Sequence, residues 1–182
     1  GSQFGVAYSS TSAGLGYDVF FSRFSPEGVV LGSRLNVTAV PADQDGPTMA
    51  WSGSQFGVAW ANAATTPGQI GFARVNQDGT KSGTSAAVVP SGSGPRSPSI
   101  AWAGTVFGIA WVDELYTADE DLYVTLVTGA GAVAGTDVRL NGGVIISYVP
   151  DLVWSGSGFG VAFESRPASD DETFMALAGF CE

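Results

Sequence analysis

A pentapeptide that recurs at a nearly fixed interval constrains this chain more than any other feature of its sequence. The segment Phe4-Gly-Val-Ala-Tyr8 returns three times, at intervals of 52, 51 and 52 residues. Its later copies begin at Phe56, Phe107 and Phe159. Self-similarity at such a period is the signature of a repeat architecture. We therefore interpret residues 1–182 as a single repeat domain of four units, at about 1–45, 46–96, 97–148 and 149–182.

Each unit contains short segments that are typical of β-strands. They are rich in β-branched and aromatic residues, alternate with period two, and are separated by Gly, Ser, Asp and Pro. Turns such as Asn76-Gln-Asp-Gly79 contain residues that tolerate the positive φ of tight hairpins. The pattern predicts an all-β fold with a four-stranded antiparallel meander in each unit. The first unit lacks its first segment and the last lacks a recognisable fourth, so both are incomplete.

The faces of the second segment differ in size. Phe56, Val58 and Trp60 share one face, whereas Gly57 and Ala59 share the other. A face exposed to water would be polar, so small apolar residues indicate that another sheet packs closely there. A bulky face against a small face, repeated from unit to unit, favours blades stacked around an axis, that is, a β-propeller-like fold.

Residues ahead of the pentapeptide carry a resemblance to a known group of proteins. Pro47-Thr-Met-Ala-Trp51-Ser-Gly53 has counterparts that begin at Pro98 and Pro150. The combined pattern Pro-x-h-Ala-Trp-x-Gly-x-x-Phe-Gly-Val-Ala-Trp, in which h is hydrophobic, resembles the tandem repeats of bacterial secreted proteins and lipoproteins. This resemblance implies a β-propeller located outside the cell or on the bacterial cell surface. It implies no activity and no catalytic motif, and the chain shows no signal peptide.

Three arrangements of the units remain open at this point. The four units could close into a compact ring with two thin blades, or they could form a fragment of a larger ring. Alternatively, the units could stack along an axis as in a β-solenoid.

Charge and composition exclude several classes of partner and of chemistry. A net charge of -10 repels phosphate backbones and anionic lipid surfaces, so we expect no nucleic-acid partner and no membrane insertion. The chain contains no histidine, which removes Ser-His-Asp catalysis and histidine metal sites. Its single cysteine, Cys181, cannot form a disulfide within the chain.

The third unit carries an acidic loop that could support chemistry. Its carboxylates are Asp113, Glu114, Asp119, Glu120 and Asp121. Paired carboxylates are the groups that glycoside hydrolysis needs. Oxygen ligands from Asp113, Asp119 and Asp121 would also suit calcium, the only cofactor that the sequence suggests. Asp170, Asp171 and Glu172 occupy the corresponding region of the fourth unit. The alternative for all of them is a solvated loop.

Other residues have both a binding and a structural interpretation. Trp51, Trp102 and Trp154 recur at one position and could stack on sugars, although packing between sheets is favoured. Tyr17, Tyr116 and Tyr148 lie in loops and would suit a binding rim. Arg23 and Arg74 are expected to point outward into solvent. Asn36-Val-Thr38 is either a glycosylation sequon or the end of a strand.

The sequence favours a non-enzymatic module for extracellular binding or adhesion. Such a module would present loops to a glycan, polymer or protein at the cell surface, with carbohydrate as one candidate ligand. It has no assigned catalytic residue and no assigned ligand-binding residue. The alternative is a structural or assembly module that forms a homo-oligomer through its incomplete blades. A glycoside hydrolase-like enzyme comes third.

Overall fold

The computed structural model describes residues 2–11, 16–40, 43–62, 68–89, 94–113, 121–140, 146–166 and 172–178. These residues form fourteen strands and no helix. The strands are β1 (Phe4–Thr11), β2 (Tyr17–Phe24), β3 (Leu35–Asn36), β4 (Gln44–Trp51), β5 (Gln55–Asn62), β6 (Gln69–Asn76), β7 (Lys81–Val89), β8 (Pro95–Trp102), β9 (Val106–Asp113), β10 (Asp121–Thr128), β11 (Val133–Arg139), β12 (Ile146–Trp154), β13 (Phe159–Arg166) and β14 (Glu172–Ala178). No helix that could span a membrane occurs among these residues.

The strands form four separate antiparallel sheets in chain order. Blade 1 contains β1 to β3, blade 2 contains β4 to β7, blade 3 contains β8 to β11, and blade 4 contains β12 to β14. Every sheet is a simple meander, in which each strand pairs with the next one along the chain. The predicted all-β fold is therefore confirmed, as is the prediction that the first and last units have three strands each.

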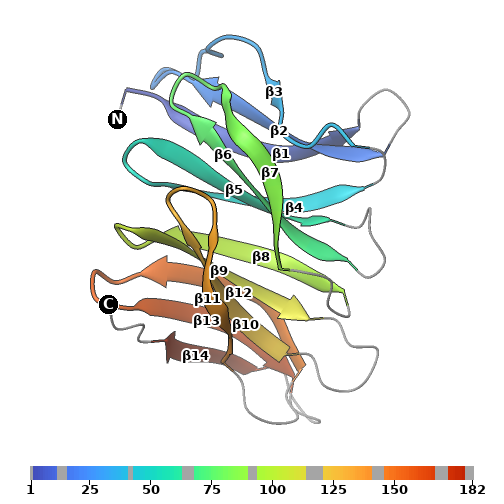
Figure 1. Ribbon diagram of the computed structural model, residues 1–182, viewed down its shortest axis with the longest axis vertical. Coiled ribbons are helices and arrows are strands. Elements are labelled where there is room, and N and C mark those ends of the chain that lie inside the picture. The colour runs from blue at the N-terminus through green and yellow to red at the C-terminus, as the bar shows by residue number, and fades with distance from the viewer. Residues whose placement is uncertain are drawn as a thin grey trace.

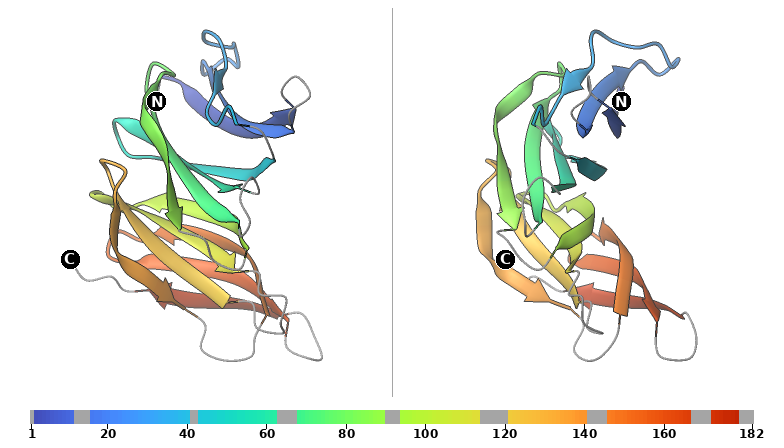
Figure 2. Two further views of the ribbon diagram at one scale, coloured as in Figure 1. Left: turned by 45° about the vertical axis from the view of Figure 1, so that its right-hand side comes forward. Right: turned by 90° about the vertical axis from the view of Figure 1, so that its right-hand side faces the viewer.

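The blades lie one after another in an open arc. Blade 1 is at one end and blade 4 at the other, as both views of Figure 2 and the vertical order in Figure 1 show. The first strands of blades 2, 3 and 4, which are β4, β8 and β12, contact one another in succession. The four blades thus follow the course of a propeller ring without closing it, and the compact four-bladed ring is not what this chain forms.

Each of these three first strands contains a β-bulge immediately before a proline. The bulges leave Gly46, Ser97 and Val149 with φ of 57°, 52° and 40°. A residue before proline is normally extended, so a left-handed conformation at Ser97 and Val149 is strained. The bulge lets the strand continue on the N-terminal side of the proline. Blades 2, 3 and 4 therefore begin two or three residues before the boundaries expected from the sequence.

Successive blades pack through a phenylalanine that faces a glycine. A Cβ atom added to Gly57 would lie 2.6 Å from the ring of Phe107 in the next blade, and one added to Gly108 would lie 2.7 Å from Phe159. Gly5 faces Phe56 in the same way, at 2.9 Å. The phenylalanines belong to the bulky face, and the glycines to the small face, that the sequence predicts for these strands. The absence of a side chain on the glycine lets the ring approach the backbone of the neighbouring sheet.

An arginine adds a further contact between blades 1 and 2 and between blades 2 and 3. Arg23 Nη1 donates to the carbonyl of Gln77 in blade 2, and Arg74 Nη1 donates to the carbonyl of Gly129 in blade 3. The expectation that these arginines simply point into solvent is therefore corrected. Each side chain is half-buried and bridges its own blade to the hairpin of the next. In blade 3 the equivalent position is Leu126, which has no group to donate such a bond.

We predict that Gly108→Ala lowers the free energy of unfolding by about 1–3 kcal/mol, because the new methyl group would overlap the buried Phe159 ring. Chemical denaturation followed by tryptophan fluorescence measures this difference.

Gly68→Ala is the matched control. A Cβ atom at Gly68 would have its nearest neighbour at 3.5 Å, an ordinary contact. This variant should lose no stability, since replacing glycine also lowers the entropy of the unfolded chain. Equal loss in both variants would show that the phenylalanine contact is not the cause.

Candidate functional site

The candidate site lies at the end of blade 3 where β9 stops and β10 starts. In each blade, the register pairs a residue near the end of the strand that carries the repeated pentapeptide (β1, β5, β9 or β13) with one near the start of the next strand. These pairs are Ser10 with Asp18, Asn62 with Gln69, Asp113 with Asp121, and Ser165 with Glu172. Blade 3 is thus the blade in which both members of the pair are carboxylates. It departs from the repeat at a position that packing does not determine.

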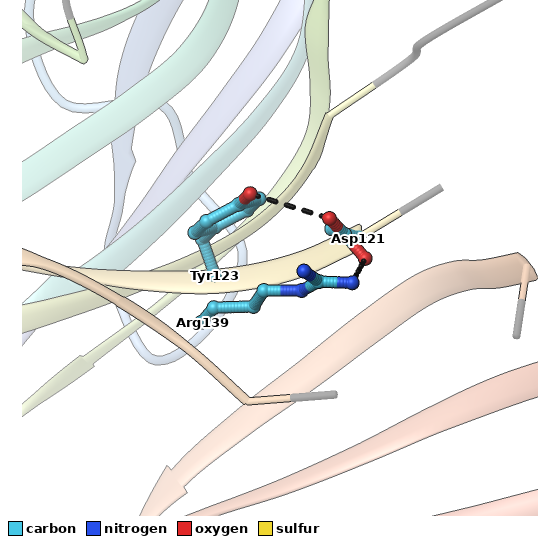
Figure 3. Close-up of polar contacts among 3 residues, drawn as sticks. All are labelled: Asp121, Tyr123 and Arg139. Carbon is cyan, nitrogen blue, oxygen red and sulfur yellow. Dashed lines mark hydrogen bonds and ion pairs between the residues drawn. The ribbon is translucent and has the colours of Figure 1, made fainter. Parts of the chain in front are cut away.

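Asp121 is buried at this site and held by two donors (Figure 3). Its Oδ1 atom accepts from Arg139 Nη2 at 2.5 Å, and its Oδ2 atom accepts from the Tyr123 hydroxyl at 3.3 Å. The side chain of Asp121 is 8% exposed, whereas that of Arg139 is 43% exposed. Arg139 comes from β11 and Tyr123 from β10, so the register of these two strands builds the cluster.

Tyr123 joins the polar cluster to the aromatic residues of the blade. Its ring stacks on Trp111, with the centroids 4.7 Å apart and the planes at 16°. Burial raises the pKa of the Tyr123 hydroxyl, and the negative charge of Asp121 raises it further. The phenol is therefore a hydrogen-bond donor at neutral pH, which is the role it has toward Asp121.

A second set of hydrogen bonds fixes the ring on which Tyr123 stacks. Trp111 Nε1 donates to Thr125 Oγ1 at 2.9 Å, and Thr125 Oγ1 donates to Asp137 Oδ1 at 2.6 Å. Thr125 is buried, with 1% of its surface exposed. The indole therefore has a defined orientation, which also limits the positions open to the Tyr123 ring.

Blade 1 has a related cluster around Asp18, at the position equivalent to Asp121. Asp18 Oδ2 accepts from Asn36 Nδ2 at 2.8 Å, and Asp18 Oδ1 accepts from Thr38 Oγ1 at 2.9 Å. Both polar side chains of the Asn36-Val-Thr38 sequon are thus engaged within the blade. In blade 1, neutral side chains donate hydrogen bonds to the carboxylate of Asp18, whereas in blade 3 the cationic Arg139 donates to the carboxylate of Asp121.

The structure places only part of the predicted calcium site. Asp113 and Asp121 face each other across β9 and β10, and Asp119 lies outside the described residues. In the described part of the chain, no three acidic, cysteine or histidine residues form a group that could hold a metal ion. The calcium site of Asp113, Asp119 and Asp121 stays a prediction, and Arg139 supplies a positive charge at the place where the ion was expected.

Most of the repeated aromatic residues pack within or between sheets. Trp60, Trp111 and Phe163 are buried, and the first-strand tryptophans contact phenylalanines of the same blade. Tyr17 is 49% exposed at the start of β2 and remains available at the surface. Glu114, Tyr116, Glu120, Asp170, Asp171 and Cys181 lie outside the described residues, as do the side chains of Tyr148 and Glu172.

Sequence comparison does not assign this chain to a group. No protein-family model matches the sequence, and a search among characterised proteins finds no relative.

Solved structures share the arrangement of blades. An endo-arabinase from Bacteroides thetaiotaomicron matches with a TM-score of 0.61 and 13% identity, over 98% of this chain and 71% of its own. A thermostable family-43 glycoside hydrolase matches with a TM-score of 0.64 and 12% identity, over 100% and 69%. A puromycin-hydrolysing peptidase from Mycobacterium tuberculosis matches with a TM-score of 0.55 and 15% identity, over 94% and 29%. At this identity the comparison shows a shared fold.

The two glycoside hydrolases are five-bladed β-propellers, which confirms the predicted fold class. The same finding corrects the functional prediction. The sequence favoured a non-enzymatic binding or adhesion module, whereas an endo-arabinase and a family-43 glycoside hydrolase share this fold over 98% and 100% of the chain. The prediction that the chain is not an enzyme is wrong on this comparison. The shared fold favours the hypothesis that the sequence placed third, a glycoside hydrolase-like enzyme.

We predict that Asp121→Asn lowers the pKa of Tyr123, because a neutral neighbour no longer opposes formation of the phenolate. A pH titration of ¹³C-labelled tyrosine by NMR measures the shift, with Tyr123→Phe used to assign the resonance. Asp78→Asn, in a hairpin of blade 2, should leave this pKa unchanged. An unaltered Tyr123 pKa in Asp121→Asn would contradict the electrostatic coupling.

Proposed function

We propose that this chain is the larger part of a glycan-hydrolysing β-propeller and acts on an arabinan-type polysaccharide. The observation that carries the proposal is the pair of facing carboxylates, Asp113 and Asp121, in a chain that shares its blade arrangement with an endo-arabinase. Fold alone does not determine function, so the assignment depends on the chemistry of this site.

The cross-strand pairing gives the two carboxylates a suitable relation to one another. Residues directly opposite in an antiparallel pair project from the same face, with Cβ atoms about 4.5–5.5 Å apart. The carboxyl groups of Asp113 and Asp121 therefore both reach one region beside the end of β9 and β10. Glycoside hydrolysis uses two carboxyl groups at about 5–9.5 Å, one on each side of the scissile bond.

The surroundings of the two residues suggest different roles. Both oxygens of Asp121 accept hydrogen bonds, from Arg139 and Tyr123, which is the arrangement of an ionised carboxylate. We assign Asp121 as the nucleophile or base and Asp113 as the general acid. Arg139 and Tyr123 are positioning residues, since they orient Asp121 through its oxygen atoms. Asp113 donates its proton to the glycosidic oxygen as the bond from that oxygen to the anomeric carbon breaks. From the opposite face, Asp121 either attacks the anomeric carbon or takes a proton from the water that attacks it.

The glycan is the partner that this proposal retains from the sequence analysis. A polysaccharide is too large to enter a cell, so the proposal includes the extracellular or cell-surface location that the sequence suggests. A net charge of -10 is compatible with a neutral sugar polymer, which needs no opposite charge for binding.

We predict that the protein releases reducing sugar from arabinan, and that Asp113→Asn lowers the rate by at least about 100-fold, the contribution of a general acid. Arabinan in a reducing-sugar assay at several pH values is the measurement. Asp78→Asn, in the β6–β7 hairpin of blade 2 and away from the candidate site, should keep the wild-type rate.

Folding of each variant is checked by denaturation, because Asp113 lies directly opposite Asp121, which forms an ion pair with Arg139. Hydrolysis that survives in folded Asp113→Asn would contradict the assigned site. Failure of the wild-type protein both to bind and to cleave arabinan would contradict the substrate.

A further inference from the structure

Blade 1 exposes the edge of a strand that is covered in the other blades. In the described part of the chain, β1 pairs with β2 alone. Its counterparts β5, β9 and β13 each lie between two strands. The backbone groups on the outer edge of β1 are therefore open to pairing with a further strand.

The side chains of β1 are exposed where their counterparts are buried. Phe4 is 60% exposed, whereas the equivalent phenylalanines are 7%, 1% and 1% exposed. Val6 is 42% exposed, whereas its three equivalents are fully buried. These equivalents are Phe56, Phe107 and Phe159 for Phe4, and Val58, Ile109 and Val161 for Val6. In the other blades these side chains are covered on one side by the first strand of the same blade and on the other by the glycine face of the blade before. The first of these two coverings is the one that an added strand beside β1 would supply.

An apolar groove runs between this edge and blade 2. It has a volume of about 440 Å³ and is lined by Phe4, Gly5, Met49, Trp51 and Phe56, among others. Trp51 is 40% exposed here. The groove is thus lined by the start of β1 on one side and by Met49, Trp51 and Phe56 of blade 2 on the other.

The other blades show what fills such a groove. Their first strands place a tryptophan directly opposite the phenylalanine in the register. The ring centroids are 4.5 Å apart for Trp51 and Phe56 and for Trp102 and Phe107, and 5.0 Å apart for Trp154 and Phe159. The residue before the tryptophan, which is alanine in blades 2 and 3 and valine in blade 4, lies opposite the small glycine. Among the described residues, Phe4 is the phenylalanine of this set that has no tryptophan opposite it.

We propose that the edge of β1 accepts an extended segment of the pattern Pro-x-hydrophobic-Ala-Trp-x-Gly as an antiparallel first strand of blade 1. Its tryptophan lies opposite Phe4, its alanine opposite Gly5, and its hydrophobic residue opposite Val6. Backbone hydrogen bonds supply affinity, and the tryptophan supplies specificity. A second folded copy is a poor occupant, since its own strands of this pattern are paired in their sheets. The proposal is independent of the proposed hydrolase function.

A peptide taken from the chain itself tests this inference. A fluorescently labelled peptide of residues 95–104 is titrated with the protein and followed by anisotropy, and hydrogen exchange maps the bound site. We expect saturable binding that slows amide exchange in β1 and raises the Tm. Replacing the peptide's tryptophan with alanine should weaken binding by tenfold or more, as for a buried aromatic anchor.

Two protein variants separate binding from folding. Phe4→Ala should leave the Tm of the free protein within about 2 °C, because Phe4 is mostly exposed, and should weaken peptide binding by tenfold or more. Val29→Ala, at a side chain that is 61% exposed on the β2–β3 connection, should leave binding unchanged. Equal binding of the alanine peptide, protection outside β1, or a stable dimer that excludes the peptide would each overturn the proposal.

Discussion

The rest of the structure depends on the contact between a phenylalanine in one blade and a glycine in the blade before it. A sheet can receive a whole aromatic ring against its backbone only where no Cβ atom intervenes. That requirement explains why the second strand alternates between very large and very small residues. It also explains why both faces of the middle strands are buried, and why the blades follow one another at a constant spacing in the sequence.

The repeated residues build the scaffold, and the departures from the repeat build the candidate site. Blade 2 has Asn62 and Gln69 where blade 3 has two carboxylates, so blade 3 carries negative charge at a place where blade 2 is neutral. Arg139 and Tyr123 then hold one of these carboxylates at a fixed place. Blade 1 departs from the repeat in another way, because the outer edge of β1 and the ring of Phe4 are exposed.

The features that recur in every unit could be predicted from the sequence, because the same residue pattern occurs in each of the four copies. The strand number, the meander, and the large and small faces all follow from residues such as Phe107 and Gly57. The ion pair of Asp121 with Arg139 could not be predicted. It depends on the register between β10 and β11, which shifts at a bulge that no local sequence pattern indicates. The bulges before Pro98 and Pro150 were missed for the same reason. The sequence did identify Asp113 and Asp121 as candidate carboxylates, but the cross-strand pairing that brings them face to face is visible only once the strands are aligned.

A double-mutant cycle at Gly57 and Phe107 tests the account most directly. Gly57→Ala and Phe107→Leu should each lower the free energy of unfolding, the first by overlap with the ring and the second by loss of buried surface. If the ring and the missing Cβ atom are coupled, the smaller leucine accommodates the alanine. The double variant should then be more stable than the sum of the single changes predicts, by about 1 kcal/mol or more. Strictly additive changes would contradict the claim that this contact holds successive blades together.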